Sequence, residues 1–218
     1  NPKDMKLHIL LLAGLFFQMG HTQDYEQVKP QELQAMVSFL TSDELKGRET
    51  ATESELIAAQ FIKSKFIESG IKPYFKTYMD PFESKQYKGV NVVGFIEGND
   101  PKLKHEMVLL GAHYDHLGFG KIVNNDSIAN GANDNASGTA GILELAEKLS
   151  FNKKLLKRSI ILMAYNAEEE GLLGSKYYVN NPTIELSSVI VMINMDMIGR
   201  MSDNKVTIGG TGTSPGFE

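Results

Sequence analysis

The sequence has no cysteine among its 218 residues. This absence excludes disulfide bonds, thiolate metal sites, a cysteine nucleophile and a lipid-modified N-terminal cysteine. The sequence also has no run rich in lysine and arginine, and its formal net charge is −5. Nucleic acid is therefore not expected as a partner.

A long hydrophobic run is also missing. The run ILLLAGLFFQMG, residues 9–20, follows Met5 and Lys6 and is short of the roughly 20 apolar residues that a bilayer-spanning helix needs. A short apolar run behind a basic residue is typical of a signal peptide, although a buried core helix would show the same pattern. We expect residues 1–22 to be the signal peptide with its preceding residues, and the protein to be exported to the periplasm or the extracellular space, without stable membrane insertion.

Several common motifs are absent as well. The sequence contains no H-E-x-x-H, and no G-x-G-x-x-G follows a predicted strand. The Asx-rich loop near Asp126 is not an EF-hand, because its twelfth position is Ser137 rather than glutamate. The glycine-rich stretch at residues 209–216 is interpreted as a loop.

Helical signals dominate the first third of the mature chain. Pro30 opens a predicted helix over residues 31–42. A second helix begins at a capping-box pattern formed by Thr52 and Glu55 and ends at Gly70. Its predicted apolar face consists of residues at helical spacing, namely Leu56, Ala59, Ile62 and Phe66.

From residue 89 onward, apolar strands alternate with helices. Strands are predicted over 89–98, 107–113, 159–167 and 187–197, with a possible last one at 205–210, and helices over 136–150 and 171–181. Near-continuous apolar strands separated by helices are typical of an α/β domain with a mostly parallel central sheet and helices on both faces. We therefore expect residues 23–218 to form one domain.

Acidic and imidazole groups follow three of these strands. His113 ends one strand, Glu168 to Glu170 follow another, and Asp196 follows a third, while Asp134 lies in an Asx-rich loop before a helix. In open α/β sheets such groups meet at the carboxyl edge of the sheet, where ligands bind. So many like charges would repel one another unless a cation lay among them.

The ligand types favour zinc or a similar divalent ion, because imidazole joins the carboxylates. Asp134 could bridge two metals, and Asp115 could orient His113. Each residue alone has a simpler interpretation: Asp134 as a helix cap, Asp196 as a local loop residue, and the glutamate run as a solvated face. His116 is either a substrate-side residue or a surface loop residue.

In combination, these segments resemble the exported di-zinc aminopeptidases of metallopeptidase family twenty-eight. The resemblance rests on LTSDELKGRET, KGVNVVGFIEG, GAHYDHLG, GANDNASGTAGILELAE, AYNAEEEGLLGS and NMDMIGR, and it extends from about residue 40 to 210. It implies a zinc-exopeptidase fold, that is, a three-layer α/β sandwich, and the cleavage of N-terminal residues from peptides with a free N-terminus.

The resemblance also implies a role for each site residue. His113 and Asp196 would bind one zinc, Asp134 would bridge two, and Glu169 would bind the second. Glu168 would be the general base that takes a proton from the attacking water, and Asp115 would orient His113. Glu170 matches no functional position and is expected to be solvated.

The family pattern also needs a further histidine downstream of Asp196, but all five histidines of this sequence precede it. We therefore expect the chain to be incomplete at its C-terminus and to hold the second zinc poorly. Three alternatives remain open: a glutaminyl cyclase-like acyltransferase with one zinc, a carboxypeptidase-branch enzyme of the same fold, and a non-enzymatic binding module.

Overall fold

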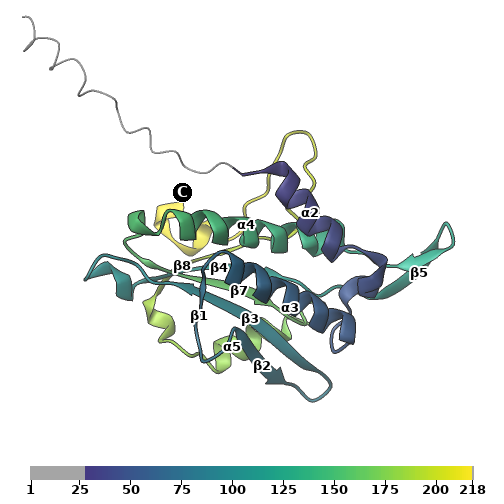
Figure 1. Ribbon diagram of the computed structural model, residues 1–218, viewed down its shortest axis with the longest axis horizontal. Coiled ribbons are helices and arrows are strands. Elements are labelled where there is room, and N and C mark those ends of the chain that lie inside the picture. The colour runs from purple at the N-terminus through teal and green to yellow at the C-terminus, as the bar shows by residue number, and fades with distance from the viewer. Residues whose placement is uncertain (1–27, 218) are drawn as a thin grey trace, which may run out of the picture.

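The computed structural model describes residues 28–217 and is built around a six-stranded sheet (Figure 1). The expected signal peptide lies outside the described residues. The strands follow the order β1-β3-β7-β4-β8, and β2 pairs with β3. The bounds of these strands are β1 Lys72–Pro73, β2 Met79–Glu83, β3 Lys88–Ile96, β4 Met107–His113, β7 Ser159–Tyr165 and β8 Val189–Asn194.

The centre of the sheet is parallel and one side is antiparallel. Strand β4 runs parallel to both of its neighbours, β7 and β8, whereas β3 is antiparallel to β7, and β1 and β2 are antiparallel to β3. The predicted α/β class is confirmed, with a sheet that is mixed rather than parallel throughout. The three parallel strands are the ones that precede the predicted site residues.

Helices cover both faces of the sheet, as the sequence predicts. Helices α2 (Pro30–Leu40), α3 (Glu53–Glu68) and α4 (Ser137–Phe151) lie on one face, and the short α5 (Leu173–Asn180) lies on the other (Figure 1). Strand β7 shows the alternation that this layering requires. Its residues Ile160, Leu162 and Ala164 join the core beneath the three helices, and Ile161 and Met163 join the core on the α5 side.

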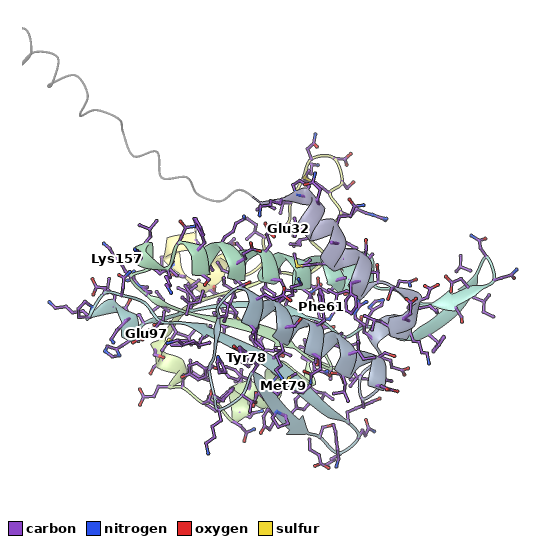
Figure 2. The ribbon with its side chains drawn as sticks, in the orientation of Figure 1. Glu32, Phe61, Tyr78, Met79, Glu97 and Lys157 are labelled. Carbon is purple, nitrogen blue, oxygen red and sulfur yellow. The ribbon has the colours of Figure 1, made fainter. Side chains whose placement is uncertain are left out.

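The helix boundaries follow from local signals. Pro30 occupies the start of α2, and the Thr52 hydroxyl accepts a hydrogen bond of 3.3 Å from the backbone N–H of Glu55 at the start of α3. The two helices meet through stacked rings of Phe39 and Phe61, whose centroids are 4.2 Å apart; Figure 2 labels Phe61. The ring contact packs α2 against α3.

The predicted apolar face of α3 is only partly right. Ala59, Ile62 and Phe66 are buried, but Leu56 is 52% exposed, and the neighbouring Glu55 is buried instead at 1%. Glu55 faces the interior because the hydroxyl of Tyr114, just beyond the end of β4, donates a hydrogen bond to its carboxylate. A tertiary partner therefore overrides the helical pattern at this turn.

Two further features differ from the sequence prediction. Residues 205–210 do not form a strand, because their backbone lies outside the sheet with only a single bridge between Ser202 and Lys205. A two-stranded hairpin, β5 (Phe119–Val123) and β6 (Asp126–Ile128), projects from the body between β4 and α4 and was not predicted (Figure 1). None of the helices among residues 28–217 combines the length and apolar character needed to cross a membrane.

Candidate metal centre

The predicted site residues gather at the carboxyl edge of the parallel strands. In the register of the sheet, His113 at the end of β4 lies opposite Tyr165 at the end of β7, and Gly111 lies opposite Asn194 at the end of β8. The loops that leave β7 and β8 therefore start beside His113. They carry Glu168 and Asp196 to the same place.

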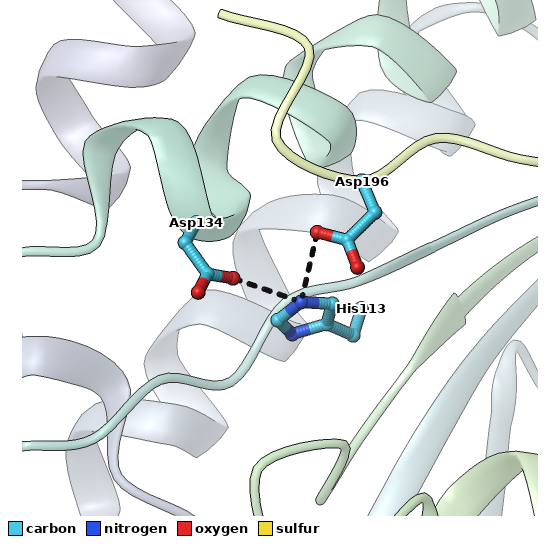
Figure 3. Close-up of side chains that lie close together, drawn as sticks. All are labelled: His113, Asp134 and Asp196. Carbon is cyan, nitrogen blue, oxygen red and sulfur yellow. Dashed lines mark ion pairs between the residues drawn. The ribbon is translucent and has the colours of Figure 1, made fainter. Parts of the chain in front are cut away.

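The first cluster surrounds the imidazole of His113, which is 3% exposed. Its Nε2 atom lies 3.1 Å from an Asp134 carboxylate oxygen and 3.6 Å from an Asp196 oxygen, as Figure 3 shows. The Oε2 atom of Glu168 is slightly farther from the same nitrogen, at 3.9 Å. One imidazole nitrogen thus faces carboxylates from three separate loops.

The second cluster consists of His116, Asp134 and Glu169. The Nδ1 atom of His116 lies 2.7 Å from Oε1 of Glu169, and one ligand-type atom from each of the three residues lies within 4.8 Å of the others. Asp134 belongs to both clusters. The sequence left the role of His116 open between a substrate-side residue and a surface loop residue; its side chain is only 10% exposed and points into this cluster.

Asp115 ties the two clusters together. Its buried carboxylate accepts hydrogen bonds from the backbone N–H groups of Glu168 at 3.1 Å and of Glu169 at 3.2 Å. The same carboxylate lies 3.7 Å from Nδ1 of His113, and that nitrogen is closer, at 3.2 Å, to the backbone carbonyl of Asp115. Asp115 therefore fixes the start of the glutamate loop as well as the ring of His113.

Arg48 holds the other side of the site and was not predicted from the sequence. Its guanidinium is fully buried and donates hydrogen bonds to the backbone carbonyls of Tyr114 at 2.9 Å, Asn130 at 2.8 Å and Gly131 at 3.0 Å. These bonds connect the end of β4 to the loop that carries Asp134. Burial lowers the pKa of Arg48 to about 10, against the opposing charges of Asp115 and Asp134, so the guanidinium stays charged near neutral pH.

Asn135 is a second residue that the sequence did not reveal. Its buried side-chain amide donates to the carbonyl of Met195 at 3.0 Å and accepts from the N–H of Met197 at 3.2 Å. It thereby holds the backbone on both sides of Asp196. Gly138 lets the two segments approach closely, since a Cβ there would lie 2.3 Å from the Met195 carbonyl oxygen.

The charges of the site shift the pKa values of its members. Burial alone would lower the pKa of His113, but its bond to Asp115 and the charges of Asp115, Glu168 and Asp196 outweigh burial and raise the pKa to about 9. Burial also raises the pKa of Glu168, mainly against the opposing effect of His113. The imidazole thus balances part of the negative charge by holding a proton, and a metal would compete with that proton because ligation needs the neutral ring.

The donor set fits divalent zinc. Each cluster offers one imidazole and carboxylates, which are the ligands that zinc shares with neighbouring transition metals, and zinc commonly takes three protein ligands in catalytic sites. The four carboxylates of Asp134, Glu168, Glu169 and Asp196 carry charge that two divalent ions would balance. A hollow of ≈ 250 Å³ opens beside the first cluster. Its walls include His113, Tyr165, Glu168, Leu172, Met192 and Asp196.

All six predicted site residues lie at this edge of the sheet. His113, Asp134 and Asp196 form the first cluster, Glu169 joins the second, Glu168 borders the hollow, and Asp115 lies beneath the glutamate loop. Glu170 is exposed.

A family model matches this part of the chain. Residues 91–218, more than half of the sequence, match the family described as Peptidase family M28. The chain belongs to peptidase family M28. The matched residues include every member of both clusters.

Similar proteins include a named aminopeptidase. The chain is 34% identical over 140 residues to leupeptin-inactivating enzyme 1 of Streptomyces exfoliatus, a match that covers 64% of this chain and 28% of that protein. The fold of this chain is similar to that of the LapA aminopeptidase of Legionella pneumophila, with 28% identity and a TM-score of 0.59. This match covers 78% of this chain and 43% of that one. This M28 chain therefore spans less than half the length of these relatives.

A likeness of fold alone extends to another enzyme class. A glutaminyl cyclase from Bacteroides thetaiotaomicron, bound to N-acetylhistamine, has a TM-score of 0.65 to this chain at 21% identity, covering 84% of this chain and 66% of that one. The M28 fold is thus shared with proteins of a different named activity.

Proposed function

We propose that this M28 chain forms the catalytic part of a zinc-dependent aminopeptidase, which hydrolyses the N-terminal peptide bond of peptides. The observation that carries the proposal is the pair of imidazole–carboxylate clusters sharing Asp134, with Glu168 beside them at the hollow. The names of relatives, including the LapA aminopeptidase, support it.

The residues divide the work as follows. His113 and Asp196 would hold one zinc, Glu169 would hold a second, and Asp134 would contact both. When bound, two zinc ions supply Lewis-acid chemistry, lowering the pKa of water and polarising the scissile carbonyl.

Glu168 is placed to move the proton. Its carboxylate lies at the wall of the hollow, and burial raises its pKa above the usual value, which strengthens the carboxylate as a general base. Glu168 would take a proton from the attacking water and pass it to the amine nitrogen as the peptide bond breaks. Asp115 keeps this carboxylate in position through the backbone N–H of Glu168.

The proposal is tested with the complete protein and two peptides, one with a free N-terminus and its acetylated twin, each with and without chelator. We expect chelator-sensitive release of the first residue from the free peptide alone. A Glu168→Gln variant should lose about 10²–10⁴-fold in kcat while keeping its zinc content. The matched control is Glu170→Gln, which alters the exposed neighbour in the same loop.

Three outcomes would contradict the proposal. Cleavage of both peptides from the carboxyl end would indicate a carboxypeptidase, and cyclisation of an N-terminal glutamine without hydrolysis would indicate an acyltransferase. Bound zinc without either reaction would indicate a binding module.

We further propose that the protein is exported, on the grounds of the short apolar run at residues 9–20 behind Lys6. N-terminal sequencing of the protein recovered from the periplasm or the medium should begin close to residue 23. Recovery of the uncleaved chain from the cytoplasm would contradict export.

A further inference from the structure

We propose that Asn91 is a positioning residue for the proposed reaction, because its side-chain amide holds both ends of the loop that carries Glu168. The inference rests on the proposed function and adds to it a residue of β3, a strand that contributes no member to either cluster. The loop begins at Asn166, directly after β7, and ends at Gly174 in the first turn of α5. We refer to residues 166–174 as the glutamate loop.

The amide of Asn91 bonds to both ends of the glutamate loop. Its Oδ1 atom accepts a hydrogen bond of 3.2 Å from the backbone N–H of Asn166, and its Nδ2 atom donates to the backbone carbonyl of Gly174 at 3.2 Å. The two ends also meet directly, since the N–H of Gly174 donates to the carbonyl of Asn166 at 3.0 Å. One fully buried side chain therefore closes the loop at its base.

A third partner fixes the orientation of the amide. Asp80 lies opposite Asn91 in the pairing of β2 with β3, and its carboxylate accepts a hydrogen bond from Nδ2 at 3.3 Å. The Nδ2 atom thus faces two acceptors, while Oδ1 faces an N–H group. The reversed amide would place oxygen against oxygen on one side and N–H against N–H on the other, so one arrangement alone satisfies all three partners.

The glutamate loop needs this support because its backbone is strained. Ala167 and Leu172 have φ values of 54° and 64°, in the left-handed region that disfavours residues with a Cβ. These two residues flank the three glutamates. Backbone in this region persists only where the surrounding structure over-determines it. Asn91 supplies bonds just outside the two strained residues, at the positions where the loop leaves the sheet and enters the helix.

Gly174 allows the close approach of the amide. A Cβ at this position would lie 2.4 Å from Oδ1 of Asn91 and 2.3 Å from the carbonyl oxygen of Asn166. A larger residue would therefore displace the amide or move the start of α5, and the glutamate loop with it. A misplacement of about 1 Å at a reacting group can cost about 10²-fold in rate.

The loop has a further attachment that does not involve Asn91. The side chain of Asn166 donates a hydrogen bond of 2.7 Å to the hydroxyl of the buried Tyr114, and Asp115 binds the N–H of Glu168. Loss of the Asn91 amide should therefore shift the glutamate loop without releasing it from the fold. A shifted loop displaces Glu168 from the position in which it can move the proton.

A purely structural role would use the same bonds. Asn91 could stabilise the folded protein without affecting where Glu168 lies. The two roles differ in what they change: a structural role affects the melting temperature alone, whereas a positioning role lowers kcat of the folded protein when zinc is saturating.

The experiment uses two variants of the complete protein that disturb one contact from opposite sides. Asn91→Leu has a similar size and removes the bonds to both loop ends, and Gly174→Ala places a methyl group against the amide. The matched control is Val93→Ala, which shortens a buried side chain two positions along β3, in the core on the α5 side. Melting temperature, zinc affinity by chelator competition, and kcat and KM on a peptide with a free N-terminus are measured for each.

Asn91→Leu and Gly174→Ala should lower kcat by about 10–100-fold at saturating zinc, with KM nearly unchanged. One zinc ion should also bind about 10–100-fold more weakly, because Glu169 belongs to the same loop. Val93→Ala should lower the melting temperature and leave kcat unchanged. Because Asn91 acts through Glu168, adding Asn91→Leu to Glu168→Gln should lower kcat no further than Glu168→Gln does alone.

The outcomes distinguish failure of this inference from failure of the proposed function. An unchanged kcat in both variants, with a lowered melting temperature, would assign a structural role and overturn the inference. An equal loss of kcat in Val93→Ala, or losses that multiply when Asn91→Leu is combined with Glu168→Gln, would overturn it as well. If Asn91→Leu does not fold, Gly174→Ala decides. Absence of chelator-sensitive peptidase activity in the unaltered protein would contradict the proposed function, and this inference with it.

Discussion

Replacing Glu55 by glutamine should stabilise the protein above pH 7 and leave its stability below pH 4.5 nearly unchanged. Glu55 is 1% exposed, beneath the metal-site edge, and its carboxylate accepts a hydrogen bond from the Tyr114 hydroxyl. Burial raises its pKa from 4.5 to about 7, against the lowering effect of that bond. Glutamine keeps the shape and the acceptor oxygen but has no charge to bury.

Proton linkage explains why the stability of the unaltered protein falls as the pH rises. Below pH 4.5, the pKa of Glu55 in the unfolded chain, the carboxyl is protonated in both the folded and the unfolded state. Folding then buries no charge. Between 4.5 and about 7 the unfolded chain loses the proton while the folded chain keeps it, and stability falls as pH rises. Each unit of difference between the two pKa values lowers the free energy of unfolding by roughly 1.4 kcal/mol, so the decrease reaches about 3 kcal/mol above pH 7.

The assay is urea unfolding followed by circular dichroism at several pH values between about 5 and 8, with chelator present throughout. The difference in unfolding free energy between Glu55→Gln and the unaltered protein should grow by about 1.4 kcal/mol per pH unit and then level off near pH 7. Glu53→Gln, an exposed position in the same turn of α3, is the matched control and should show no such slope. A difference independent of pH, or a Glu55→Gln protein that is less stable at pH 8, would refute the reasoning.

Three further substitutions test the framework around the clusters. Arg48→Met should lower the unfolding free energy by about 3 kcal/mol or more in urea titrations, because several buried carbonyls lose their donor at once; an unchanged midpoint would contradict this. Gly131→Ala should lower the melting temperature, since residue 131 has φ +60° and a Cβ there would lie 2.4 Å from the Asp134 carbonyl oxygen. An unaltered melting curve would contradict this prediction. Asn135→Ala should weaken zinc binding by about 10–100-fold, because the backbone around Asp196 loses its support; chelator competition measures this, and wild-type affinity would remove Asn135 from that role.

The sequence predicted the elements that carry strong local signals. The strands β4 and β7, the cap at Thr52 and the helix α4 all lie close to their predicted ranges. Long apolar runs and caps act within a few residues, so they can be recognised without knowing the fold. The convergence of His113, Asp134 and Asp196 followed from placing each at the end of a parallel strand or before a helix.

What the sequence did not reveal depends on distant contacts. The direction of β3 is set by its partner β7, and apolar periodicity has the same appearance in either direction. The phase of α3 at Glu55 is set by Tyr114, which is 59 positions away. The predicted strand at residues 205–210 pairs with no strand of the sheet in the described structure, although β8 is an edge strand.

The supporting residues of the site were missed for a related reason. Arg48 lies in a turn far from every ligand in sequence, and only its bonds to Asn130 and Gly131 reveal its connection to the metal-site loop. Asn135 follows Asp134 directly, yet its importance depends on the loop after β8. His116 carried a signal, since it is an imidazole in the same loop as His113, but its partner Glu169 comes from another strand.

The pairing of β8 with β4 has a consequence for how the protein is made. Strand β4 is synthesised long before β8, so for a time its outer edge presents unpaired N–H and C=O groups that another chain could take up. Parallel pairing between such distant segments is slow, because a long loop must close before any contact forms. The loop carrying Asp196 arrives only with β8, and the nascent chain therefore has no complete first cluster. A metal ion can therefore find all three residues of the first cluster only after β8 has been made, whereas every member of the second cluster precedes β8 in the chain.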